Sequence, residues 1–61
     1  MFTRQHYVAI ATVLREHIDG ARSDEYRASV VQVAHALAIL FRQDNEQFDR
    51  DRFLKASGVG S

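Results

Sequence analysis

Three histidines, His6, His17 and His35, are the side chains best suited to change charge near neutral pH or to bind a metal. His6 and His17 share one side of a predicted helix but are eleven residues apart, which is about 16 Å along the helix axis. They cannot hold one metal ion, and no His-x-x-x-His pair occurs in the chain. We therefore expect no metal site and place the histidines at the rim of a protein interface. His35 has apolar neighbours, so its burial there would make assembly depend on pH.

The serine and carboxylate side chains do not occur in the patterns that nucleophilic or acid–base catalysis requires. The serines have no strand-to-helix elbow and no evident base, and the chain has no glycine-rich phosphate loop. The carboxylate pairs Asp24/Glu25 and Asp49/Asp51 fall at predicted helix starts, where they compensate the helix dipole. The sequence therefore predicts no enzyme activity, no catalytic residue and no cofactor.

The basic residues do not form the patch that nucleic-acid binding requires. The formal net charge is zero, so there is no excess of Lys and Arg to displace phosphate counterions. The segment 50–57 could act as the recognition helix of a helix-turn-helix, with Arg50, Arg52 and Lys55 as its contacts. Asp49 and Asp51 cancel those charges, and neither end of the chain is a basic arm. A small DNA-binding module is therefore kept only as an alternative.

Length and composition limit the chain to one small domain over residues 1–61. A domain of this size has marginal stability, and short chains usually add a disulfide, a metal or a partner subunit. There is no Cys, so association with another subunit remains. No apolar run approaches the roughly 20 residues that span a bilayer, and the start has no signal-peptide pattern. We expect a cytoplasmic protein with no membrane partner.

Helix periodicity predicts the elements that position these residues. The pattern is all-α: an antiparallel helical hairpin over about 4–19 and 24–42, with a short third helix over about 50–57. The predicted N-caps are Thr3, Ser23 and Asp49. Phe2 with Tyr7, and Phe48 with Phe53, have the spacing of hydrophobic staples.

The third helix is too short to be stable alone in water. We expect it to dock on the hairpin through an aromatic and aliphatic cluster of Phe41, Phe48, Phe53 and Leu54. Residues 58–61 are expected to form a flexible tail.

The second helix is apolar on nearly all sides, which is typical of a helix that is buried all round. Its predicted core stripe is Tyr26, Val30, Val33, Ala34, Leu37, Leu40 and Phe41. One partner helix and one short helix cannot also cover the opposite side. We therefore predict self-association through Ala28, Val31, His35, Ala38 and Ile39, with Val13 of the first helix beside them.

The segment from Phe41 to Gly58 resembles the ending of many short, uncharacterised phage and prophage proteins. Those proteins read F-x-x-D-N-x-x-F-D-R-x-R-F-L-x-A-C-G, commonly after a start similar to Met1-Phe2-Thr3. This chain has Glu46 where the familiar form often has Pro, and Ser57 where it has Cys. The resemblance covers about eighteen residues at the end of the chain. It implies a phage or prophage origin and a bacterial host cytoplasm, but no function.

The leading hypothesis is a small phage-encoded accessory protein that acts as a homo-oligomer and modulates a host protein. A second hypothesis is a sponge for a small ligand such as a nucleotide. Its anion pockets would lie at subunit interfaces and use Arg residues such as Arg4, Arg22, Arg27 and Arg42. DNA binding is the third hypothesis.

Overall fold

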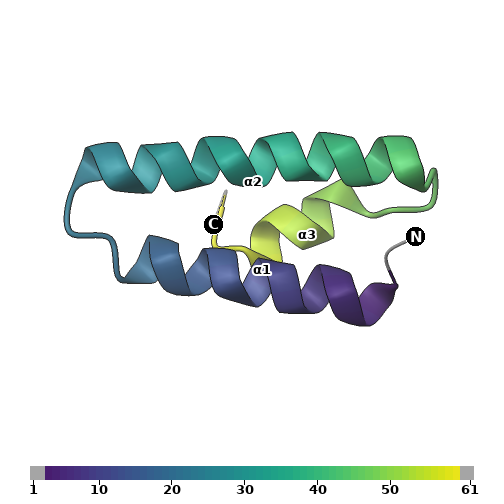
Figure 1. The fold of residues 1–61 in the computed structure, drawn as a ribbon, viewed down its shortest axis with the longest axis horizontal. Helices are drawn as coiled ribbons and strands as arrows, with labels where there is room; N and C mark the ends of the chain where they lie inside the picture. The colour runs from purple at the N-terminus through teal and green to yellow at the C-terminus, as the bar shows by residue number, and fades with distance from the viewer. Residues whose placement is uncertain (1–2, 60–61) are drawn as a thin grey trace.

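A computed structural model describes residues 3–59, and these residues form three helices without a strand. The helices are α1 (Arg4–Asp19), α2 (Asp24–Asp44) and α3 (Arg50–Ala56). Helices α1 and α2 form an antiparallel hairpin, and α3 lies between them over the half that holds the start of α1 and the end of α2 (Figure 1). Because α3 contacts both long helices, it closes one face of that half of the hairpin.

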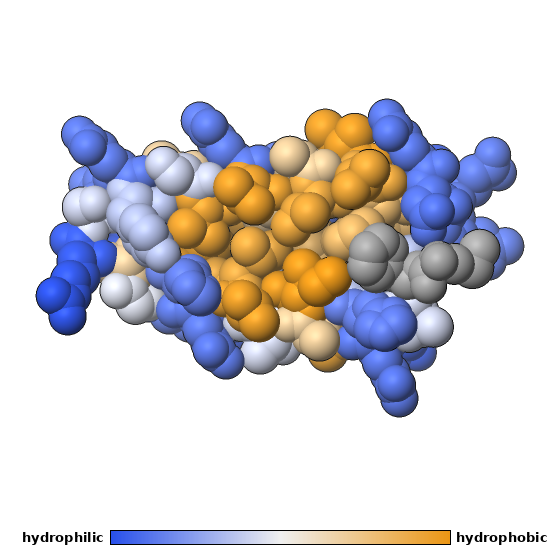
Figure 2. All heavy atoms as spheres, viewed as in Figure 1, coloured by the Kyte–Doolittle hydropathy of each residue, from blue (hydrophilic) through white to orange (hydrophobic). Residues whose placement is uncertain are grey.

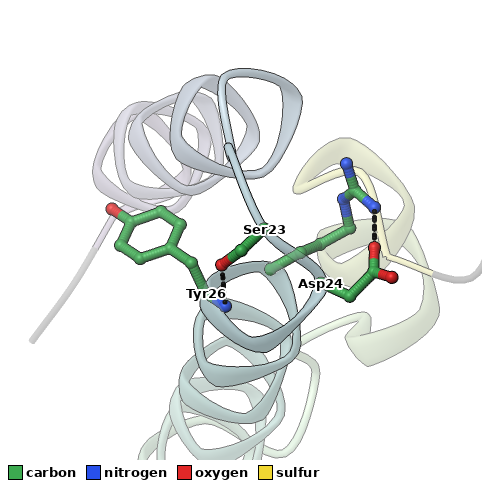
Figure 3. A network of polar contacts seen from close by, with 4 residues as sticks. Ser23, Asp24 and Tyr26 are labelled. Atoms are coloured by element: carbon green, nitrogen blue, oxygen red, sulfur yellow. Dashed lines mark hydrogen bonds and ion pairs between the residues drawn. The ribbon is translucent and has the colours of Figure 1, made fainter.

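Side-chain caps begin α2 and α3. Ser23 Oγ accepts a hydrogen bond from the backbone N–H of Tyr26 at 3.1 Å (Figure 3), and Asp49 Oδ1 accepts one from the N–H of Arg52 at 3.0 Å. Each cap satisfies a backbone donor that has no partner within the helix. Ser23 and Asp49 are therefore confirmed as the caps that the sequence predicts.

The cap of α1 uses a histidine. Thr3 is the N-cap, in extended conformation, and its backbone N–H donates to His6 Nδ1 at 3.1 Å. His6 thus takes the place that Glu or Gln holds in a capping box. The predicted staple between Phe2 and Tyr7 cannot be compared, because Phe2 lies outside the described residues.

Helix α2 continues to Asp44, two residues beyond the predicted end at 42. The chain then turns at Asn45, whose backbone N–H donates to the carbonyl of Phe41 at 2.9 Å. The Asn45 side-chain oxygen accepts from the N–H of Gln47 at 3.0 Å, which is an Asx turn. Helix α3 ends at Ala56, one residue before its predicted end.

The predicted flexible tail over 58–61 is wrong for its first two residues, and residues 60–61 lie outside the described part. Gly58 has φ +87°, its N–H donates to the carbonyl of Lys55 at 3.1 Å, and the N–H of Val59 donates to that of Leu54 at 2.9 Å. This pair of bonds is a Schellman motif, which satisfies the last carbonyls of α3. It also turns Val59 into the core, where its side chain is buried.

The core has an aromatic end and an aliphatic end. The ring of Phe41 lies 5.4 Å from that of Phe53 and 5.5 Å from that of Phe48, and Tyr7 adds a fourth ring 4.7 Å from Phe48. Leu54 is half-buried against this cluster. The four residues predicted to dock α3 thus lie together, and Tyr7 of α1 joins them although the sequence analysis did not include it in this cluster. The buried hydrophobic residues are Ala11, Leu14, Ile18, Ala34, Ala38, Phe41, Phe48, Phe53 and Val59.

Candidate interaction surface

The residues predicted to form the self-association surface do not lie together on one exposed surface. Ala38 is fully buried, and Val31 is half-buried against the core. The prediction for Ala38 is therefore corrected, because its side chain packs inside the molecule, whereas Val31 packs against the core with one side only. The reason is the position of α3, which packs on this side of the hairpin.

Two observations show which side of each long helix lies next to α3. On α2, Ile39 and Arg42 line a shallow groove together with Phe48 and residues 49–51 at the start of α3. On α1, a Cβ built on Gly58 would lie 3.6 Å from Arg15 Cγ. The sides of α2 and α1 that carry Arg42 and Arg15 are therefore the sides next to α3 and its C-terminal turn.

The other residues of the predicted surface are exposed but lie apart. Ala28, His35 and Ile39 are exposed on the flank of α2 that carries Arg42, and of these three only Ile39 lines the groove beside α3. Val13 is 53% exposed, and it points away from Arg15 because two residues correspond to about 200° of helix rotation. The structure thus places Val13 on the opposite face of the hairpin from the α2 residues with which the sequence grouped it.

A different apolar surface is open instead. Val33 and Leu40, which the sequence placed in the core, are 51% and 52% exposed, and Tyr26 is 46% exposed. Val33 and Arg42 are nine residues apart, which puts them about 180° apart around α2. The exposed side chains of Tyr26, Val33 and Leu40 therefore face away from α3.

Half-buried residues widen this set of exposed side chains into a continuous area. Val30 and Leu37 of α2, and Ile10 of α1, pack against the core with one side and remain accessible on the other. We call the set the open apolar face: Ile10, Tyr26, Val30, Val33, Leu37 and Leu40. Figure 2 shows an unbroken apolar area across the middle of the molecule, with hydrophilic side chains at both ends. An exposed apolar area of this kind typically marks an interaction site.

The spacing on α2 gives this face a regular geometry. Positions 26, 30, 33, 37 and 40 are separated alternately by four and three residues, which is the a/d repeat of a coiled-coil seam. The sequence analysis included all five positions in its core stripe and so missed that they can contact another helix. The a/d spacing was the signal for a second contact surface, because it includes these five positions and excludes Ala34 and Phe41 of the same core stripe.

Polar chemistry is sparse among residues 3–59. No group of three or more His, Asp or Glu side chains is placed to hold a metal ion. His6 caps α1, His17 Nδ1 lies 2.8 Å from the carbonyl of Val13, and His35 is exposed. The ion pairs Arg15–Asp19 and Asp24–Arg27 are exposed, so each adds little to stability.

A second groove lies at the hairpin turn. It is lined by Glu16, His17, Gly20, Arg22, Ser23 and Tyr26. Figure 3 shows the Tyr26 ring extending from the start of α2 on the side away from Asp24. The groove therefore adjoins one end of the open apolar face.

Comparisons with known proteins add no relative: no family model matches the chain, and searches of curated proteins and of solved structures find no match. None of the helices in residues 3–59 is both long enough and apolar enough to cross a membrane.

Proposed function

We propose that this protein is a small helical interaction protein that acts as a homo-oligomer, and that a second copy covers the open apolar face. The observation that carries the proposal is the exposure of Val33 and Leu40, each more than half accessible, within the open apolar face. Burial of such side chains contributes about 25 cal/mol per Å². Because the chain is small, this gain is large relative to its own marginal stability.

The accessible surface supports the same proposal. The area is 4739 Å², whereas a compact monomer of 7.0 kDa has about 4,000 Å². The excess of about 700 Å² is close to the roughly 800 Å² that each partner buries in a standard interface. The elongated chain thus exposes more surface than a compact monomer of the same mass.

The biological setting of the proposal is a phage or prophage protein in a bacterial host, where the assembled form modulates a host protein. The phage setting rests on the resemblance carried by Phe41–Gly58, and the modulation of a host protein rests on analogy with other small phage proteins. Self-association through the open apolar face leaves the α3 side free, including the groove beside Ile39 and Arg42.

The test is the molar mass in solution, measured by light scattering over a range of concentrations. We expect a multimer for the wild type and a folded monomer for Val33→Asp, because the substitution places a charge in the middle of the face. Ile39→Asp is the matched control: Ile39 is 52% exposed but lies beside α3. A monomeric wild type, or equal effects of the two substitutions, would contradict the proposal.

A second candidate function is the binding of a small anion such as a nucleotide, which the groove at the hairpin turn favours. Arg22 and His17 offer donors to phosphate, and Tyr26 offers a ring on which a base can stack. Nucleotides should then raise the melting temperature of the wild type but not that of Arg22→Gln. The control is Arg50→Gln, at an exposed arginine outside this groove, and an equal response of all three proteins would exclude the site.

A further inference from the structure

We propose that α2 pairs with α2 of a second copy in antiparallel orientation, through the seam formed by Tyr26, Val30, Val33, Leu37 and Leu40. The proposal rests on the proposed function, since it presupposes that the open apolar face is covered by another copy. It adds the identity of the contacting helix, its direction and its register.

The first step concerns which helix can make the contact. The seam extends over five a/d positions of α2, whereas α1 contributes Ile10 to the open apolar face. A second helix packs along a seam of this length by inserting its own a and d side chains between those of α2. Helix α2 is therefore the element with a sufficiently long regular seam.

The second step concerns the flank of the seam that faces solvent. Ser29, Ala36 and Gln43 are seven residues apart, all exposed, and all without formal charge. Gln43, at the end of this flank, also lines the edge of the groove beside α3. Charged residues at such flanking positions usually decide which partners are excluded. Here two copies of the same flank can approach without like-charge repulsion, and the small Ala36 allows the backbones to come close.

The third step concerns direction. Asp44 occupies the next seam position after Leu40. Neither its carboxylate nor the guanidinium of Arg22 has a hydrogen-bond or ion-pair partner among residues 3–59. Parallel pairing would place two Asp44 side chains together. Antiparallel pairing instead brings Asp44 of one copy to the Tyr26 end of the other, where Arg22 lines the same groove.

The register follows from matching seam positions in that direction. If Asp44 lies opposite Tyr26 of the second copy, then Leu40 lies opposite Val30, and Leu37 lies opposite Val33. Each leucine of one copy therefore contacts a smaller valine of the other. The two Ala36 residues then flank the two-fold axis. With the α1 helices alongside, the two hairpins form a four-helix bundle.

Single cysteines test the direction, because the natural sequence has no Cys. With a short bismaleimide cross-linker, Ala36→Cys should give a covalent dimer in high yield at concentrations where light scattering shows association. Ala28→Cys is the matched control, an exposed alanine on the flank of α2 that carries Arg42, and should remain monomeric on denaturing gels.

A mixture of Ser29→Cys and Gln43→Cys should cross-link as a heterodimer, and neither variant should cross-link efficiently alone. Efficient cross-linking of each variant with itself would show parallel pairing and overturn the proposal. A wild type that associates while Ala36→Cys does not cross-link would overturn the α2–α2 contact but leave the proposed function standing. A monomeric wild type would overturn both.

A charge exchange tests the register independently. Arg22→Glu and Asp44→Arg each place like charges opposite one another, and each should raise the dissociation constant about tenfold. The double variant restores opposite charges and should return to within about threefold of the wild type. Additive weakening in the double variant would show that these residues do not face each other. Circular dichroism of each variant confirms that the helices are intact.

Discussion

The two faces of the hairpin differ in what covers them, although α2 contributes apolar residues to both. On the face next to α3, Ala38 and Val31 are fully or partly buried, and three phenylalanines fill the space between the helices. On the open apolar face, Val33 and Leu40 remain more than half exposed. A helix of seven residues thus decides which side of a 21-residue helix belongs to the core. Apolar character alone does not distinguish a core face from an interaction face.

The largest expected effect comes from removing the aromatic contact that holds α3 in place. Phe53→Ala should destabilise the fold by about 3–5 kcal/mol, because Phe53 is buried and its ring contacts those of Phe41 and Phe48. Thermal unfolding followed by circular dichroism measures the loss, and at this chain length we expect little folded protein at 37 °C. Val8→Ala, at a residue 58% exposed, is the control and should change stability little. A small effect of Phe53→Ala would mean that the hairpin does not need α3.

A pair of aspartate substitutions compares the two faces directly. Val31→Asp should lower the free energy of unfolding by about 2 kcal/mol or more, because its carboxylate would lie half-buried against the core without a partner. Val33→Asp should cost under about 1 kcal/mol in the monomer, since Val33 is 51% exposed. Urea unfolding at concentrations where both variants are monomeric provides the comparison. The reverse order of stability would mean that the two faces are exchanged.

The C-terminal turn provides a smaller and purely conformational effect. Gly58→Ala should destabilise the fold by about 1–2 kcal/mol, because φ at this position is +87°. The space beside Gly58 accepts a Cβ, whose nearest neighbour would be Arg15 Cγ at 3.6 Å, so the cost comes from the backbone. Val8→Ala, at an exposed residue of α1, serves as a control in the same urea experiment. A neutral Gly58→Ala would show that the Schellman turn does not contribute to docking Val59.

Loss of a helix cap is expected to have the smallest effect. Ser23→Ala removes the acceptor for the N–H of Tyr26 and should cost about 1 kcal/mol. Ser23→Asp keeps an acceptor and adds a negative charge at the helix start, so it should retain the stability of the wild type. Thermal melts of the three proteins distinguish capping from a general effect of substitution, and equal losses in both variants would argue against the cap.

Local signals in the sequence were sufficient for the elements themselves. Ser23 and Asp49 have short polar side chains immediately before helical periodicity, and the structure uses both as caps. Phe48 and Phe53 bracket the start of α3 at staple spacing, and their rings lie 5.4 Å apart. Each of these features involves residues within about five positions of one another. Their geometry therefore follows from the helix alone.

Two local features were missed although the sequence carried a signal for each. His6 stands three residues after Thr3, the position at which a side chain can reach back to the N-cap. Val59 is an apolar residue directly after Gly58, the arrangement that accompanies a Schellman turn. The sequence analysis assigned His6 to an interface rim because it is a histidine, and assigned Val59 to a tail. The distance of each residue from the nearest helix end was the more informative feature.

By itself the sequence determined three helices, their approximate ends, their caps and the aromatic residues that join α3 to the hairpin. Only the tertiary structure decided which side of α2 is inside. Apolar residues occur on nearly every side of α2, so periodicity allows more than one rotation of the helix against α1. The rotation of α2 depends on the packing of Phe48 and Phe53 against Phe41. It also depends on the packing of the C-terminal turn at Gly58 against Arg15 and Ile18. Those contacts join residues distant in the chain, and their packing leaves Val33 and Leu40 exposed.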